Sequence, residues 1–65
     1  MRISLNGRPH ETAARTLQEL AAEEKAPPRG IAIARNGAVV RRADWPAVVL
    51  EADDRIELIR AVQGG

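Results

Sequence analysis

The chain contains no cysteine, phenylalanine or tyrosine, and only one tryptophan and one histidine. Without cysteine it has neither a disulfide framework nor a thiolate metal site. Its single histidine, His10, argues against a histidine-based metal cluster and against a catalytic triad. Glu11 follows directly, but neighbours in a strand point to opposite faces, so the two are not expected to form a proton-transfer pair. We therefore predict no catalytic residue, no bound metal and no bound cofactor, and the chain is not expected to be an enzyme.

An excess of one charge and long apolar runs are also missing. Ten lysines and arginines are balanced by nine acidic residues, with no basic stripe and no stacking aromatics, so nucleic-acid binding has little support. No apolar run approaches the ~20 residues of a membrane span, and the N-terminus lacks the apolar region of a signal peptide. A strand pattern that begins at residue 2 leaves no room for a targeting segment. We expect a cytoplasmic protein.

The chain of 65 residues is short enough to form only one small domain. A domain of this size buries only about 60% of the surface of its unfolded chain. Stability must therefore come from leucine, isoleucine, valine and alanine packing together, and we expect Trp45 to pack over an edge of this core.

The first residues predict a β-hairpin. Residues 2–5 alternate polar and apolar side chains, and Asn6-Gly7 is a strong signal for a two-residue hairpin turn. The return strand, from about residue 8 to 13, contains Pro9. Proline denies a backbone donor, which favours an edge position for this strand.

A helix is predicted to begin at Thr16. Thr16 and Glu19 have the spacing of a capping box, in which Thr16 accepts from the Glu19 amide and Glu19 reaches back to the Thr16 amide. Pro27-Pro28 is predicted to end the helix. One apolar stripe faces the core and contains Leu17, Leu20, Ala21 and Glu24.

The second half predicts short strands. Gly30 opens a strand over residues 31–35, Asn36-Gly37 makes a second tight turn, and residues 39–41 return. An irregular turn, a short apolar segment, a further turn and the final strand are predicted at residues 43–46, 48–50, 51–54 and 55–61.

This order of elements predicts an α+β fold. One main helix lies across one face of a mixed sheet of four to five strands. If the first strand pairs with the last, both ends of the chain lie centrally in the sheet. The C-terminal residues then leave from a rigid strand.

Two glycines, Gly64 and Gly65, end the chain after this strand. Glycine has no Cβ and wide backbone freedom, so this end is slim. That suits a main-chain carboxylate that threads into the active site of another protein and is activated there. An idle tail or a cloning remnant is the alternative, because termini are commonly disordered.

The final strand also indicates a surface. Its inner face is assigned to Ile56 and Leu58, and its outer face to Glu57 and Ile59. A single exposed apolar residue such as Ile59 is ordinary. Alternatively, Ile59 and one of Val39 or Val40 form a small docking patch. The residues predicted to dock or to contact the receiving enzyme are Ile59, Arg60, Val40, Val62 and Gln63.

Short motifs along the whole chain occur in the order of a known family: Leu5-Asn6-Gly7, Thr16-Leu17, Ala34-Arg35-Asn36-Gly37, Val40, Asp44-Trp45, Asp54-Arg55-Ile56-Glu57 and Ala61-Val62-Gln63-Gly64-Gly65. This ordered set resembles the ThiS family, the sulfur carrier proteins of thiamine biosynthesis. The resemblance implies a ubiquitin-like β-grasp domain over residues 1–61 and a flexible tail over residues 62–65.

The resemblance also implies the chemistry. In the family, a ThiF-like adenylating enzyme activates the terminal carboxylate, here that of Gly65, and consumes ATP. Sulfur from a cysteine desulfurase or a rhodanese-type protein then gives a thiocarboxylate, which the carrier delivers to a ThiG-like thiazole synthase. Gly64, Gln63 and Val62 would belong to the arm, the C-terminal segment that threads into the enzyme. The free carrier is expected to be a monomer.

One departure concerns the turn before the last strand. The family commonly has Gly-Asp there, whereas this chain has Asp53-Asp54. The two carboxylates fall short of a calcium loop because no other ligands cluster beside them. We assign them to the turn, where Asp adopts left-handed backbone less readily than the Gly of the family.

Other functions stay open at the level of sequence. One is a carrier for molybdopterin or another thiocarboxylate-dependent synthesis, although the molybdopterin carriers are usually longer and richer in aromatics. A second is a ubiquitin-like protein modifier, for which the single lysine, Lys25, leaves little scope for self-linked chains. A third is an interaction module with an inert tail.

Overall fold

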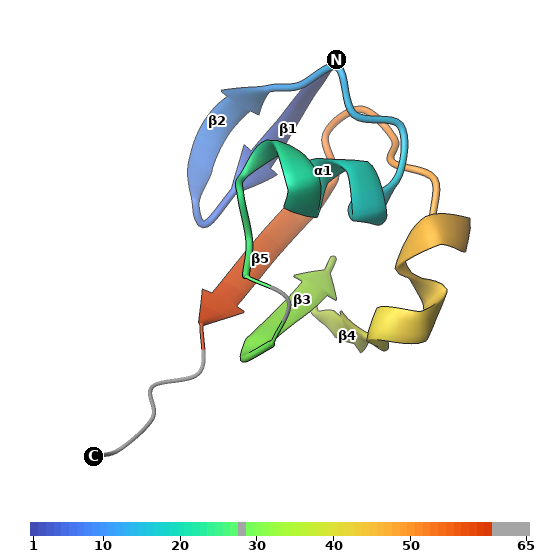
Figure 1. The fold of residues 1–65 in the computed structure, drawn as a ribbon. Coiled ribbons are helices and arrows are strands. Elements are labelled where there is room, and N and C mark those ends of the chain that lie inside the picture. The colour runs from blue at the N-terminus through green and yellow to red at the C-terminus, as the bar shows by residue number, and fades with distance from the viewer. Residues whose placement is uncertain (28, 61–65) are drawn as a thin grey trace.

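The computed structural model describes residues 1–27 and 29–60. Its elements are β1 (Arg2–Leu5), β2 (Arg8–Glu11), α1 (Leu17–Glu23), β3 (Ile31–Arg35), β4 (Ala38–Val40), the 3-10 helix η1 (Arg42–Ala47) and β5 (Arg55–Arg60). The five strands form one sheet in the order β2-β1-β5-β3-β4. Helix α1 lies across one face of this sheet (Figure 1).

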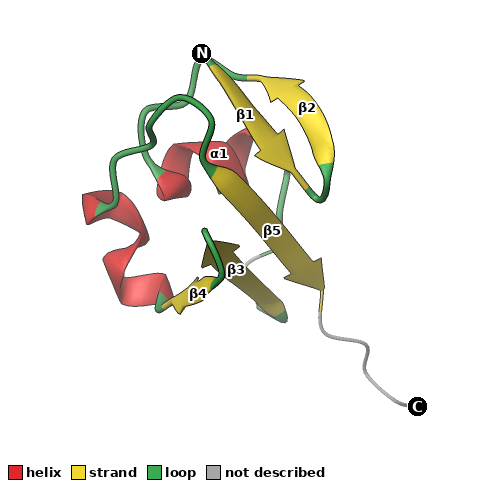
Figure 2. Cartoon of the chain, turned by 180° about the vertical axis from the view of Figure 1, so that it is seen from behind, coloured by secondary structure: helices red, strands yellow, loops and turns green. Residues whose placement is uncertain are grey.

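The sheet is mixed, as predicted. β1 pairs parallel with β5, whereas β1–β2, β3–β4 and β3–β5 are antiparallel. β5 therefore occupies the centre of the sheet with β1 beside it, which confirms the predicted pairing of the first and last strands. In Figure 2, seen from behind, the strands lie in front of α1, so the face opposite the helix is turned to the viewer.

Both predicted hairpins form around their Asn-Gly turns. Asn6 and Asn36 have φ angles of 52° and 51°, and Gly7 and Gly37 have 81° and 90°, the left-handed conformations that a two-residue hairpin turn of this kind requires. Pro9 lies on the edge strand β2, as predicted. Strand β2 ends at Glu11 and is therefore shorter than the predicted return strand, which extends to about residue 13.

Helix α1 begins as the capping pattern predicts, although one of its two bonds differs. The Glu19 N–H donates to Thr16 Oγ1 at 3.1 Å. The Glu19 carboxylate, however, accepts from the backbone N–H of Arg15 at 2.9 Å rather than from that of Thr16. The Glu19 side chain thus accepts a backbone N–H one residue before the predicted one, and it still satisfies a donor at the start of the helix.

The helix ends earlier than the prolines predict. Lys25 takes a left-handed φ of 55°, its N–H donates to the Ala22 carbonyl, and the Ala26 N–H donates to the Ala21 carbonyl. This is a Schellman termination with lysine in the position that glycine usually holds. Glu24 therefore caps the helix and does not continue its apolar stripe.

The core lies between α1, η1 and the inner face of the sheet. Its buried members are Ile3, Ala14, Leu17, Leu20, Ala21, Ile33, Trp45, Leu50 and Ile56. Trp45 is predicted at a core edge but is 1% exposed, because residues 42–47 form η1 rather than an irregular turn. Its indole N–H donates to the Val40 carbonyl at 3.0 Å, and the Arg42 guanidinium lies 4.6 Å from the ring centroid. Neither described helix is long and apolar enough to cross a membrane.

The turn before β5 contains a left-handed aspartate. Asp53 adopts φ 70°, so an aspartate stands where a glycine would fit without steric cost. Its N–H donates to the Arg2 carbonyl at 2.9 Å. The turn is therefore tied to β1 as well as to β5.

Candidate functional site

β5 leads towards the C-terminal glycines, and the asparagines of both hairpin turns hold it in place. Asn6 accepts the Leu58 N–H at Oδ1 and donates its own N–H to the Ile56 carbonyl, both at 2.9 Å. Asn36 accepts the Arg55 N–H at Oδ1 and donates its N–H to the Arg55 carbonyl, both at 2.8 Å. Two turns distant in sequence thus fix the central strand from both sides.

Asp54 anchors the start of β5. It is 5% exposed, and its carboxylate accepts from the Glu51 N–H at 2.9 Å, Arg35 Nε at 2.9 Å and Asn36 Nδ2 at 3.1 Å. Burial alone would raise the pKa of Asp54, but these bonds and the Arg35 charge outweigh it and hold the pKa below its usual range. The hydrogen bond to Asp54 also raises the pKa of Arg35. The ionised carboxylate therefore ties the turn to β3.

The face of the sheet opposite α1 carries an apolar patch formed by residues of β3, β4 and β5. We call Ala32, Ala34, Val39 and Ile59 the outer patch. Ile59 lies opposite Ala32 and Val39 lies opposite Ala34 in the strand registers. Ile59 is 49% exposed and Val39 is 71% exposed. The predicted faces of β5 are confirmed, because Ile56 is buried, Leu58 packs against the core, and Glu57 is exposed.

Of the two valines predicted beside Ile59 in a docking patch, Val39 shares the face of Ile59 and Val40 does not. Val40 lies opposite the buried Ile33, is half-buried, and packs against the core. Neighbours in a strand face opposite sides, and the register gives the outer face to Val39. Arg60 is exposed at the end of β5. The docking role of these residues stays a prediction.

Comparison with known proteins identifies the family. The sequence model of the ThiS family matches residues 3–65. The chain belongs to the ThiS family. The crystal structure of a thiamine biosynthesis protein, ThiS from Geobacter metallireducens, is similar with a TM-score of 0.83 and 26% sequence identity, covering 100% of both chains. The predicted ubiquitin-like β-grasp fold is thereby confirmed.

A second relative of this ThiS-family chain is a longer protein. Thiazole synthase from Magnetococcus marinus is 44% identical over 66 residues, which cover 100% of this chain and 20% of the relative. The chain therefore spans about a fifth of the length of the curated relative that it matches.

The residues that carry the predicted ThiS-type chemistry come after β5 in the sequence, beyond Ala61. Val62, Gln63, Gly64 and Gly65 lie outside the described residues. The division into a domain at residues 1–61 and a tail at 62–65 stays a prediction for the same reason. Arg60, the last residue of β5, is the last described residue before that segment.

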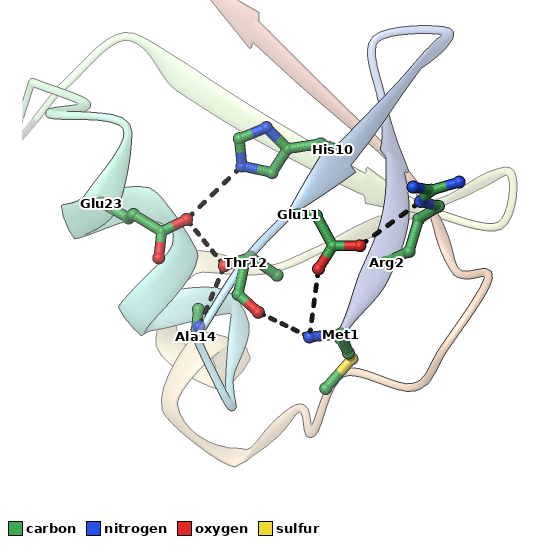
Figure 3. Close-up of polar contacts among 7 residues, drawn as sticks. All are labelled: Met1, Arg2, His10, Glu11, Thr12, Ala14 and Glu23. Atoms are coloured by element: carbon green, nitrogen blue, oxygen red, sulfur yellow. Dashed lines mark hydrogen bonds and ion pairs between the residues drawn. The ribbon is translucent and has the colours of Figure 1, made fainter.

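His10 and Glu11 make separate contacts, as the strand pattern predicts. Glu11 Oε1 accepts from Arg2 Nε at 3.4 Å, and its Oε2 lies 3.8 Å from the N-terminal amine of Met1. His10 is directed instead to Glu23 on α1, as Figure 3 shows. The sequence offered no signal for this second contact, since His10 and Glu23 are thirteen positions apart.

Proposed function

We propose that this chain is a sulfur carrier that supplies sulfur for thiazole formation in thiamine biosynthesis. The observation that carries the proposal is the match of the ThiS family to residues 3–65, which include the terminal Gly64-Gly65. The likeness over full length to a thiamine biosynthesis protein supports it. So does the relative named thiazole synthase, in which a segment similar to this whole chain is part of a longer protein.

The proposed chemistry takes place at the α-carboxylate of Gly65. A carboxylate is a poor electrophile because its charge is delocalised and oxide is a poor leaving group. In the first step, a carboxylate oxygen attacks the α-phosphorus of ATP and pyrophosphate leaves. In the second, the persulfide of the sulfur donor attacks the acyl carbon and AMP leaves, which gives an acyl disulfide. A thiol then attacks the donor-side sulfur of that S–S bond, so that a disulfide forms on the donor and a thiocarboxylate is released on Gly65. ATP is consumed on the partner, a ThiF-like adenylating enzyme, and this chemistry requires no cofactor bound to the carrier.

In this proposal the chain is a protein substrate and not a catalyst. The partner supplies the base and the groups that stabilise the developing charge. The carrier supplies reach and a narrow end: Gly65 presents the acyl carbon, and Gly64, with no Cβ, allows close approach to the enzyme. Because Asn6 and Asn36 fix β5, the arm would start from a defined position.

The adenylating enzyme is the proposed occupant of the outer patch. Ile59 lies on β5, one residue before its end, so an enzyme that receives the arm must pass close to it. Val39 extends the apolar surface away from β5, while Arg60 provides a charge next to the arm. Apolar area beside polar residues is typical of a protein interface.

The downstream acceptor is proposed to be a ThiG-like thiazole synthase. In the Magnetococcus marinus relative, the segment similar to this chain is covalently part of a protein of that name. Such linkage raises the effective concentration of two domains that must meet. A cysteine desulfurase or a rhodanese-type protein is the proposed sulfur donor.

A deletion strain tests the pathway. Removal of this chain should impose a requirement for thiamine that added thiazole also relieves. A plasmid copy of the full chain should restore growth, and a copy lacking Gly64 and Gly65 should not, although it retains the described fold. Growth without thiamine, combined with loss of the activity of molybdopterin-dependent enzymes, would instead support a sulfur carrier for molybdopterin synthesis. Unaltered growth together with conjugates of the chain on other proteins would support a modifier.

A further inference from the structure

A histidine and two glutamates meet where β2 passes the C-terminal end of α1. His10 Nε2 lies 3.4 Å from Glu23 Oε1 and 3.6 Å from Glu24 Oε2. One ligand atom from each of the three side chains lies within 4.8 Å of the others. The cluster is on the α1 side of the sheet, because His10 pairs with the buried Ile3. It is therefore separate from the outer patch.

The distances from His10 to the two carboxylates fit direct ion pairs and also leave room for a shared cation. Both are longer than the about 2.9 Å of a short N–H···O bond. Two ligands of a tetrahedral zinc ion, each about 2.0–2.2 Å from the metal, lie about 3.3–3.6 Å from one another. The separations from His10 to Glu23 and Glu24 are close to this range.

A buried hydroxyl positions one of the carboxylates. Thr12 is 6% exposed, and its Oγ1 donates to Glu23 Oε1 at 2.7 Å while accepting the Ala14 N–H at 2.9 Å. Figure 3 shows this series of polar contacts from Ala14 through Thr12 and Glu23 to His10. Such outer contacts orient the ligands of protein metal sites. The two neighbouring carboxylates also repel one another, which a cation between them relieves.

We propose that His10, Glu23 and Glu24 bind one zinc ion, with water as the fourth ligand. An imidazole nitrogen with carboxylate oxygens is a donor set that zinc accepts, and three protein ligands leave one position for water. The ion joins β2 to the end of α1. The sequence predicts no metal because it contains one histidine, and only the fold brings the glutamates to it. This site does not depend on the proposed carrier function.

Zinc titration of the full chain, freed of metal with a chelator, tests the site. Isothermal calorimetry should show saturable binding of one equivalent, and zinc should raise Tm because it binds the folded state. The histidine ring signals in a proton NMR spectrum should shift with the same saturation curve. His10→Gln and Glu24→Gln should each weaken binding by about tenfold or more. Glu11→Gln is the matched control on the same strand, and it should bind as the unaltered chain does.

Three results would overturn the proposal. The first is the absence of saturable binding in a chain whose circular dichroism shows it to be folded. The second is equal binding by the His10→Gln variant, which would place zinc elsewhere, for example on the chain termini. The third is equal weakening by Glu11→Gln, which would indicate general attraction to acidic groups.

Discussion

Gly65 is the residue at which the proposed reaction occurs, and the absence of a side chain is what it contributes. A Cβ would displace the acyl carbon within a narrow enzyme site. Since an error of about 1 Å in the position of a reacting group can cost about 100-fold in rate, Gly65→Ala should slow acyl-adenylate formation by up to that factor. Pyrophosphate release with the adenylating enzyme measures the rate. An unchanged rate would contradict the role of Gly65.

Individual residues also show where sequence interpretation stops. The alternation of inner and outer faces along β5 was predictable from a period of two, and Ile56 and Ile59 lie as expected. Which of Val39 and Val40 lies on the outer face was not predictable, because it depends on the register between β3 and β4. The same limit applies to Asn6: its turn is a local signal, but its bond to Leu58 joins residues 52 positions apart.

At the scale of elements, the turn that ends in Asp54 connects β5 to β3. The pKa of Asp54 is lower in the folded chain than in the unfolded one, so the unfolded state takes up a proton first as pH falls. Its stabilising contribution is therefore complete above the unfolded pKa of about 3.9 and is lost as pH falls through the folded pKa. Stability should decline below about pH 4 for this reason.

Variants isolate this contribution from that of other carboxylates. Asp54→Asn should lower the free energy of unfolding by about 1–3 kcal/mol at pH 7, because it removes a charged partner of Arg35. The difference from the unaltered chain should shrink below about pH 4. Asp53→Asn, in the same turn, should retain the pH dependence. Urea unfolding at several pH values measures it, and a difference that does not change with pH would contradict the assignment.

Whole elements were predictable where the signal was local. The Asn-Gly turns and the Thr16 cap depend on neighbouring residues, and both form. The end of α1 at Glu23 was not predictable from Pro27, because the left-handed conformation of Lys25 stops the helix first. Lysine gives no sequence signal for that conformation, in contrast to glycine.

At the scale of the molecule, the outer patch should affect association rather than stability. Ile59→Ser and Val39→Ser remove exposed apolar groups, so each should change stability by no more than about 0.5 kcal/mol. Each should weaken binding to the adenylating enzyme by about fivefold or more if it contributes at least about 1 kcal/mol. Titration calorimetry measures both affinities.

Two further variants make that test specific. Val49 is 63% exposed but lies outside the outer patch, so Val49→Ser should leave binding unchanged. Val40 packs against the core, so Val40→Ser should lower stability. Equal losses of affinity from Val49→Ser and Ile59→Ser would contradict docking through the outer patch.

The arrangement of the whole molecule followed from the order of its elements. A hairpin, one helix, a second hairpin and a final strand predict a mixed sheet with the last strand inside it, and β5 is central. The cluster at His10 could not be predicted from the order of the elements. His10 on β2 contacts Glu23 and Glu24 at the end of α1 only because the fold brings these two elements together. Global topology was thus easier to predict than the polar contacts it creates.

The central claim is that the end of this chain carries sulfur. The most direct test is intact mass spectrometry after incubation with ATP, a sulfur donor and the adenylating enzyme, followed by fragmentation. The account predicts that one oxygen is replaced by sulfur, that the change maps to Gly65, and that omission of ATP abolishes it. An unchanged mass with an active enzyme, or a sulfur located elsewhere in the chain, would contradict the account.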